Sequence, residues 1–349
     1  MKKTLSMRKS ISNTWILALF LLALIVLFLI NISLGSVSIP FTSVLESLFN
    51  GEVEKDTWSY IVLQYRLPKA ITAILVGSGL SVSGLLMQTL FRNPLAGPYV
   101  LGISSGASLG VAILILGSSI LGGSWLVFAN ANLMTSLAAS LGSFLVLFAV
   151  MTVSRQLKNT MSILIIGLMF SSISAAVISV LAYFSSAESL QRYTFWGFGS
   201  LGNLTWSELV IFFSIFLLAV LLVLPSIKPL NSLLLGENYA KSVGVDMKRT
   251  RNFILLSTSL FTGVITAFSG PIAFIGLAAP HMTKLILNTS DHRIILPATA
   301  VFGAMIMLIS DTVAQLPGSE YTLPINAITT LFGAPIVIWL LVRKRKMIL

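Results

Sequence analysis

The sequence predicts an all-helical membrane protein with about ten transmembrane helices in a single domain over residues 1–349. Of the 349 residues, 56% are hydrophobic and only 9% are charged, against roughly 25% charged in a typical soluble domain. The mean hydropathy is +0.96. A soluble protein of this size has too little interior to bury so many apolar side chains. The composition therefore excludes a soluble enzyme, a disordered chain and a nucleic-acid-binding domain.

The apolar residues gather in runs of about 20, the length that crosses a bilayer. The first run resembles a signal peptide, but no A-x-A-like cleavage site follows it, so we expect a retained span. The segments 272–287 and 294–312 are the weaker two. The ten expected spans are 15–32, 70–90, 99–116, 125–153, 161–183, 206–224, 253–268, 272–287, 294–312 and 323–342.

The basic residues that give a net charge of +11 are unevenly distributed. Alternating ten spans from a cytoplasmic N-terminus places 18 of the 22 Lys and Arg residues inside. The other four, Lys55, Arg66, Lys69 and Arg192, then lie outside. Cytoplasmic loops of membrane proteins carry this excess of basic residues. We therefore expect both termini in the cytoplasm, which requires an even number of spans.

The sequence lacks the residues that several catalytic, metal-binding and nucleotide-binding sites require. There is no cysteine, no G-x-x-x-x-G-K-[ST] phosphate-binding loop, and only two histidines, His281 and His292. We therefore expect no catalytic residue, no metal site and no bound cofactor. An ion-coupled transporter usually carries an acid in the middle of a span, whereas Glu208 and Asp311 fall near segment ends. The energy for transport is thus expected to come from another subunit.

The longest polar stretch between spans covers residues 228–251 and lies on the expected cytoplasmic side. We expect one short helix over residues 231–240, a break at Gly244 and a lead into the next span over residues 245–251. A solvated loop that carries positive-inside charge remains the alternative.

An ordered set of motifs resembles the FecCD permease family, the membrane subunits of ABC importers for iron chelates, haem and cobalamin. It begins with Arg66-Leu67-Pro68-Lys69 and ends with Gly333-Ala334-Pro335. Between these stand GLLMQ (84–88), NPLAGP (93–98), LGISSGA (101–107), WGFGS (196–200), LGENYA (235–240) and FIGLAAPH (274–281).

The resemblance implies a FecCD/cobalamin-permease-like bundle in the bacterial cytoplasmic membrane. It also implies a second permease copy or a close paralogue, two cytoplasmic subunits that bind ATP, and an extracytoplasmic substrate-binding protein. The expected function is a permease for an iron–siderophore complex, with haem or cobalamin as alternatives. An ion-coupled secondary transporter is the alternative from another class.

The resemblance also assigns candidate site residues. Residues 235–240 belong to helices that rest in a groove of the ATPase. Gly236 would allow a tight backbone turn there, and Ala240 and Gly244 would keep the surface small enough to dock. The ATPase-coupling candidates are Leu235, Gly236, Glu237, Ala240 and Gly244. Arg66 and Lys69 match a basic pair that docks the substrate-binding protein, with interfacial anchoring as the alternative.

Polar residues within the spans are candidates for the translocation path, although serine also satisfies helix backbones in lipid. They are Gln88, Asn93, Ser104, Ser105 and Ser171. His281 is either a gating residue or a histidine bonded to a neighbouring carbonyl. The sequence departs from the family near its end, where Gln315, Thr322 and Asn326 replace an arginine, a glutamate and a glycine. Lys284 likewise replaces an arginine.

Overall fold

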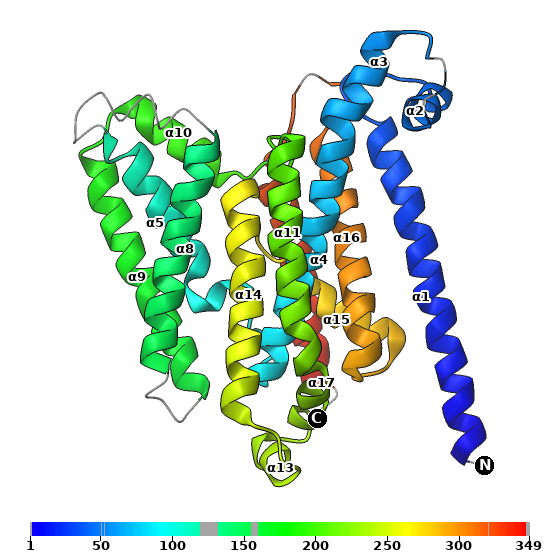
Figure 1. The fold of residues 1–349 in the computed structure, drawn as a ribbon, viewed down its shortest axis with the longest axis vertical. Helices are drawn as coiled ribbons and strands as arrows, with labels where there is room; N and C mark the ends of the chain where they lie inside the picture. The colour runs from blue at the N-terminus through cyan, green and yellow to red at the C-terminus, as the bar shows by residue number, and fades with distance from the viewer. Residues whose placement is uncertain are drawn as a thin grey trace.

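The computed structural model describes residues 2–49, 51, 53–118, 132–154, 160–319 and 321–346, and within these ranges the chain is a bundle of helices without strands (Figure 1). The helices of the first half are α1 (Lys2–Ser33), α2 (Phe41–Leu48), α3 (Asp56–Ile61), η1 (Val62–Arg66), α4 (Leu67–Leu90), η2 (Pro98–Leu101), α5 (Ile103–Ile115), α8 (Asn132–Ser154) and α9 (Thr160–Tyr183). Those of the second half are α10 (Ala187–Gly197), α11 (Trp206–Val223), η3 (Leu224–Ser226), α12 (Ile227–Leu233), α13 (Glu237–Ser242), α14 (Met247–Ser269), α15 (Ile275–Leu287), α16 (His292–Ala314) and α17 (Ile325–Lys346).

The helices that are apolar enough to cross a membrane confirm the predicted fold class. In the described ranges seven are long enough to span, and three shorter apolar helices cover Ile103–Ile115, Ile275–Leu287 and Ile325–Trp339. Each coincides with one of the ten predicted spans. Residues 125–131 of the span expected at 125–153 lie outside the described residues.

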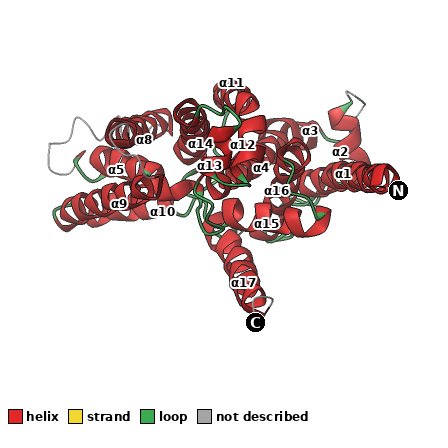
Figure 2. Ribbon diagram, turned by 90° about the horizontal axis from the view of Figure 1, so that it is seen from below, coloured by secondary structure: helices red, strands yellow, loops and turns green. Residues whose placement is uncertain are grey.

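Helix α4 forms the centre of the bundle, and all but a few of its residues are buried. It packs against α14, α15 and α16, while α1 lies outside α16. A second group, α5, α8 and α9, joins the centre where α14 contacts α5 and α8 (Figure 1). Seen along the bundle, α17 leaves the centre and projects away from it (Figure 2).

Glycines set how closely α4 approaches its neighbours. A Cβ on Gly84 would lie 1.7 Å from the Gly276 carbonyl oxygen in α15, and one on Gly77 would lie 2.3 Å from the Gly303 oxygen in α16. Only glycine permits such backbone contacts, which replace the hydrophobic effect as the source of helix association in lipid. Gly77 and Gly84 of α4 therefore serve close helix packing.

Two apolar segments are interrupted by residues with positive φ. Gly102, at φ 75°, separates η2 from α5, and Phe274, at φ 66°, precedes α15. Both helices are therefore shorter than the predicted spans, 99–116 and 272–287. Broken helices of this kind occur within transporters where irregular backbone is covered by protein.

The bundle has two distinct ends (Figure 1). The α13 end carries both chain termini and α13. The α10 end carries α2, α3 and α10.

Candidate functional site

The 234–243 turn at the α13 end consists of the junction after α12 and the short helix α13. Gly236 has φ 113° and ψ 157°, a backbone conformation that side chains exclude. It therefore ends α12 before α13 begins, and the single helix expected over residues 231–240 is wrong. Gly244, at φ 86°, follows α13 and lets the chain turn into α14. A Cβ on Gly236 would lie 3.6 Å from Arg92 Nη1, so the turn sits beside the loop that follows α4.

Apolar side chains are exposed on this turn. Leu235 is 66% exposed, Val243 53% and Tyr239 46%. Glu237 forms an ion pair with Lys241 one turn along α13, at 2.9 Å. Apolar side chains presented on a charged surface are typical of an interaction site.

Ala240 has a different place from the one expected. The resemblance put it on a low docking surface, whereas the structure buries it completely against Leu233, Val245 and Met247. Its small size lets α13 pack onto the chain before and after it. The exposed surface of the turn comes instead from the larger side chains named above.

At the α10 end, Arg66 is buried rather than displayed. Its Nη1 donates to the carbonyl oxygens of Ile32 at 2.9 Å and Ser33 at 2.8 Å, and its Nη2 donates to that of Val37. The carbonyls at the end of α1 have no partner within their own helix, and the planar guanidinium supplies one. Gly35 permits this approach, because a Cβ there would lie 2.7 Å from Nη2.

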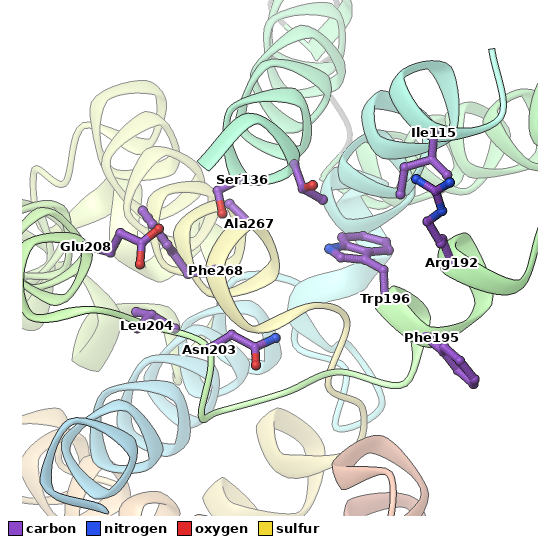
Figure 3. Close-up of a pocket in the computed structure, with 11 residues that line it drawn as sticks. Ile115, Ser136, Arg192, Phe195, Trp196, Asn203, Leu204, Glu208, Ala267 and Phe268 are labelled. Atoms are coloured by element: carbon purple, nitrogen blue, oxygen red, sulfur yellow. The ribbon is translucent and has the colours of Figure 1, made fainter. Parts of the chain in front are cut away.

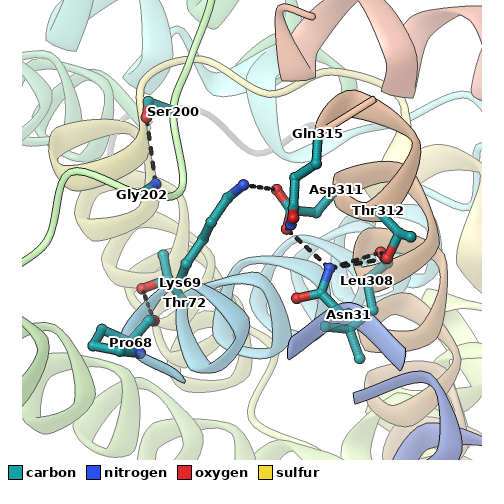
Figure 4. Close-up of polar contacts among 10 residues, drawn as sticks. All are labelled: Asn31, Pro68, Lys69, Thr72, Ser200, Gly202, Leu308, Asp311, Thr312 and Gln315. Carbon is teal, nitrogen blue, oxygen red and sulfur yellow. Dashed lines mark hydrogen bonds and ion pairs between the residues drawn. The ribbon is translucent and has the colours of Figure 1, made fainter. Parts of the chain in front are cut away.

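Lys69 forms an ion pair that joins α4 to α16. Its Nζ lies 3.1 Å from Asp311 Oδ1, and the side chains are 23% and 3% exposed (Figure 4). The other oxygen of Asp311 accepts hydrogen bonds from Asn31 Nδ2 at 3.0 Å and Gln315 Nε2 at 2.7 Å. Asp311 is therefore a buried acid, which sequence reasoning missed because it judged only the distance to the segment end.

These residues border a cavity of about 460 Å³. Arg66, Lys69, Asp311, Gln315 and Thr322 are among its lining residues. The cavity thus brings the predicted docking pair together with two of the positions that depart from the family pattern. The third, Asn326, lies nearby in α17 and accepts a hydrogen bond from the Ala273 N–H at 3.1 Å, which supports the interrupted segment before α15.

A second cavity, of about 310 Å³, lies under α10 and is lined by Trp196, Arg192, Asn203 and Glu208, among others (Figure 3). Glu208 Oε2 accepts hydrogen bonds from the N–H and the hydroxyl of Thr205, both at 2.8 Å. The two residues form the capping box of α11. Glu208 is thereby used to begin a helix.

The predicted path residues are spread over three helices and a loop. Gln88 in α4 donates to the Leu277 carbonyl oxygen at 3.4 Å, and Ser104 in α5 is hydrogen-bonded to Thr266 in α14 at 3.0 Å. Ser171 in α9 donates to the carbonyl of Gly167 at 3.0 Å.

Gln88 and Ser104 are buried, while Ser105, Ser171 and Asn93 are partly exposed. Their role in a path stays a prediction. So does gating by His281, which is half-buried in α15 directly after Pro280.

A polar cluster at the α13 end was not predicted. Hydrogen bonds link its members in a row, from Asp291 to Asn231, from Asn231 to His292 and from His292 to Thr89. Burial alone would raise the pKa of Asp291, but hydrogen bonds from the Arg293 N–H and Asn231 Nδ2 and the charge of Arg293 hold the pKa below its ordinary value. Asp291 therefore stays ionised and caps α16.

Comparison with known proteins gives consistent matches. The profile of the FecCD transport family matches residues 23–343. The chain is 34% identical over 319 residues to the hemin transport system permease protein HmuU of Yersinia pestis, covering 90% of this chain and 91% of the relative. It is 36% identical over 285 residues to the vitamin B12 import system permease protein BtuC of Klebsiella pneumoniae subsp. pneumoniae, covering 81% and 83%.

A solved structure also matches nearly the whole chain. It is described as a metal-chelate type ABC transporter in an inward-facing conformation. The TM-score is 0.80 at 32% identity, with 95% of this chain and 99% of that chain covered. The helices of this chain are thus arranged as in that transporter.

Proposed function

The chain belongs to the FecCD transport family, and from this we propose that it is the permease subunit of an ABC importer for an iron chelate of the siderophore type. It is a membrane transport subunit, and the hydrolysis of ATP falls to partner subunits. The named relatives carry hemin or vitamin B12, so haem and cobalamin are the alternative substrates. The family placement supports the transporter class, and the iron chelate is our choice within it.

The observation that carries the proposal is the turn at residues 234–243. An importer subunit without a nucleotide site must receive motion from an ATPase through a cytoplasmic surface. The turn exposes Tyr239 on α13 and Leu235 and Val243 on either side of that helix, which is braced by the Glu237–Lys241 ion pair. We propose that this turn docks in a groove of the ATPase.

The assembly we propose contains two permease subunits, as two copies or as close paralogues, two ATP-binding subunits and an extracytoplasmic substrate-binding protein. The chain would cross the bacterial inner membrane several times with both termini in the cytoplasm. The α13 end then faces the ATPase and the α10 end faces the substrate-binding protein. The excess of Lys and Arg on the cytoplasmic side supports this orientation.

An ion-coupled transporter is less well supported. Such a protein needs a buried acid that is free to take up and release a cation. Asp311 is buried, but Lys69 already neutralises it, and Asn31 and Gln315 donate to its second oxygen. Exchange of a coupling ion at this carboxylate would require the ion pair to break.

The proposal is tested by reconstituting the chain with its ATPase and its substrate-binding protein in lipid vesicles. Uptake of a labelled ferric siderophore, haem and cobalamin is measured with ATP on the α13 side, and again with a non-hydrolysable analogue. We expect siderophore uptake with ATP only. Uptake of haem or cobalamin alone would overturn the substrate, and uptake without the ATPase would overturn the transporter class.

A further inference from the structure

Three elements meet at the α13 end around one buried histidine. His292 begins α16 and is completely buried. Its backbone N–H and its ring Nδ1 both lie 2.8 Å from Asn231 Oδ1 in α12. Asn231 Nδ2 donates to Asp291 Oδ1 at 2.7 Å, which fixes the amide with its oxygen toward the histidine. Because that oxygen can only accept, Nδ1 carries the ring proton.

The other ring nitrogen reaches a third element. His292 Nε2 lies 2.9 Å from Thr89 Oγ1, in the last turn of α4. With the proton on Nδ1, Nε2 of the neutral ring can only accept, and it shares the single proton of the Thr89 hydroxyl with the Leu85 carbonyl oxygen, which also lies 2.9 Å from Oγ1. A continuous chain of hydrogen bonds therefore runs from α12 through α16 to α4. Its members are buried, and separating a buried polar group from its partner is costly, so the chain of bonds resists displacement.

This chain of hydrogen bonds lies next to the 234–243 turn. Asn231 lies in α12, directly before the 234–243 turn, and α12 packs on both α4 and α16. At the opposite end of the bundle, the Lys69–Asp311 ion pair joins the same two helices. Helices α4 and α16 are thus held together at both ends, and α12 is attached to the pair at the α13 end alone.

We propose that Asn231, His292 and Thr89 form a positioning relay that transmits movement of the 234–243 turn to α4 and α16 as one unit. The inference rests on the proposed function, because the turn must be moved by an ATPase. None of the three residues touches substrate or nucleotide in this account. Their role is to prevent α12 from moving relative to α4 and α16, so that a displacement of α12 moves both helices with it.

The test compares two threonines of α4. Thr89→Val removes the hydroxyl that meets His292 and keeps the shape of the side chain. Thr72→Val is the matched control, because Thr72 is also fully buried and its hydroxyl donates within α4, to the Pro68 carbonyl at 2.8 Å. Thr89→Ser restores the hydroxyl as a rescue variant. The readout is the number of substrate molecules imported per ATP hydrolysed by the reconstituted complex.

We expect Thr89→Val to lower this ratio about fivefold, the effect of losing one hydrogen bond on an equilibrium. ATP hydrolysis should continue, and Thr72→Val and Thr89→Ser should keep the wild-type ratio. A simple loss of stability would instead lower hydrolysis and transport together. Thr89→Ala serves as a second variant without the hydroxyl if Thr89→Val does not assemble.

An unchanged ratio in Thr89→Val, or an equal loss in Thr72→Val, would overturn the relay while the wild-type complex still imports substrate. Failure of the wild-type complex to couple ATP hydrolysis to uptake would overturn the proposed function itself, and the relay with it. The two failures are distinguished by the wild-type measurement in the same experiment.

Discussion

Lys69 and Asp311 form an ion pair with 3.1 Å between Nζ and Oδ1, and this pair joins the central helix α4 to α16 at the α10 end. The carboxylate is almost fully buried and receives two further hydrogen bonds, from Asn31 in α1 and from Gln315 (Figure 4). The Asp311 carboxylate therefore connects three helices, α1, α4 and α16. Buried ions are tolerated only when they are paired and hydrogen-bonded in this way.

Lys69→Met should lower the free energy of unfolding by about 3 kcal/mol, because it leaves the Asp311 carboxylate buried without its cation. The measurement is a denaturant titration in detergent micelles. Replacing both partners, in Lys69→Met with Asp311→Leu, should recover part of the loss, since no charge then remains buried although Asn31 and Gln315 lose an acceptor. Additive effects of the two replacements would show that the ion pair does not link the helices.

Arg66→Lys should lower the free energy of unfolding by about 2 kcal/mol although the charge is kept. A single ammonium cannot reproduce the fork that serves the carbonyls of Ile32, Ser33 and Val37. Arg192→Lys is the matched control, because Arg192 is paired with Glu188 on the surface, and its replacement should cost less than about 1 kcal/mol.

The same variants test the docking role that the resemblance gave to Arg66. If Arg66 docks the substrate-binding protein through its charge, Arg66→Lys should retain stability and most of the affinity. Arg66→Glu should then weaken association most strongly at low salt. We expect loss of stability to dominate in both Arg66 variants.

The positions of the spans were predictable from the sequence, because hydropathy is a local property of the chain. The segments at 99–116 and 272–287 show this. Their apolar residues gave the position, and Gly102 and Phe274 explain why the helices are shorter than the runs. The resemblance implied a tight turn at Gly236, whereas the residues alone predicted one helix over 231–240, because a single glycine signals either a flexible position or a helix boundary.

Pairings between distant segments were not predictable. Arg66 and Lys69 looked like external cations because alternation of spans places charges by side but says nothing of burial. Asp311 and the carbonyls at the end of α1 stand far from them in sequence and become neighbours only through helix packing. His292 was likewise considered only as a metal ligand. Its hydrogen-bonding partners come from α12 and α4, which are distant from it in sequence.

Gly84→Ala should lower the free energy of unfolding by more than about 3 kcal/mol, because the added methyl would meet the Gly276 carbonyl at 1.7 Å and force α4 away from α15. Gly263→Ala is the matched control within a helix, since its Cβ would lie 3.6 Å from the nearest atom, Ser143 Cβ. The control should be neutral or stabilising by up to about 1 kcal/mol. Equal effects of the two replacements in a denaturant titration would contradict close packing at Gly84.

Leu235→Asp should weaken binding of the ATPase by the permease about tenfold or more, because it replaces an apolar contact with a charge that must be desolvated on docking. Leu235 is the most exposed apolar side chain of the 234–243 turn. Affinity can be measured with the purified ATPase and the permease in nanodiscs.

Asn238→Asp adds the same charge three residues along the same turn, at an exposed polar position, and is the control. It should change affinity less than Leu235→Asp does. Equal weakening by both variants would mean that charge alone governs the contact, and no weakening by either would remove the turn from the interface. The thermal stability of both variants should match that of the wild type, because neither side chain is buried.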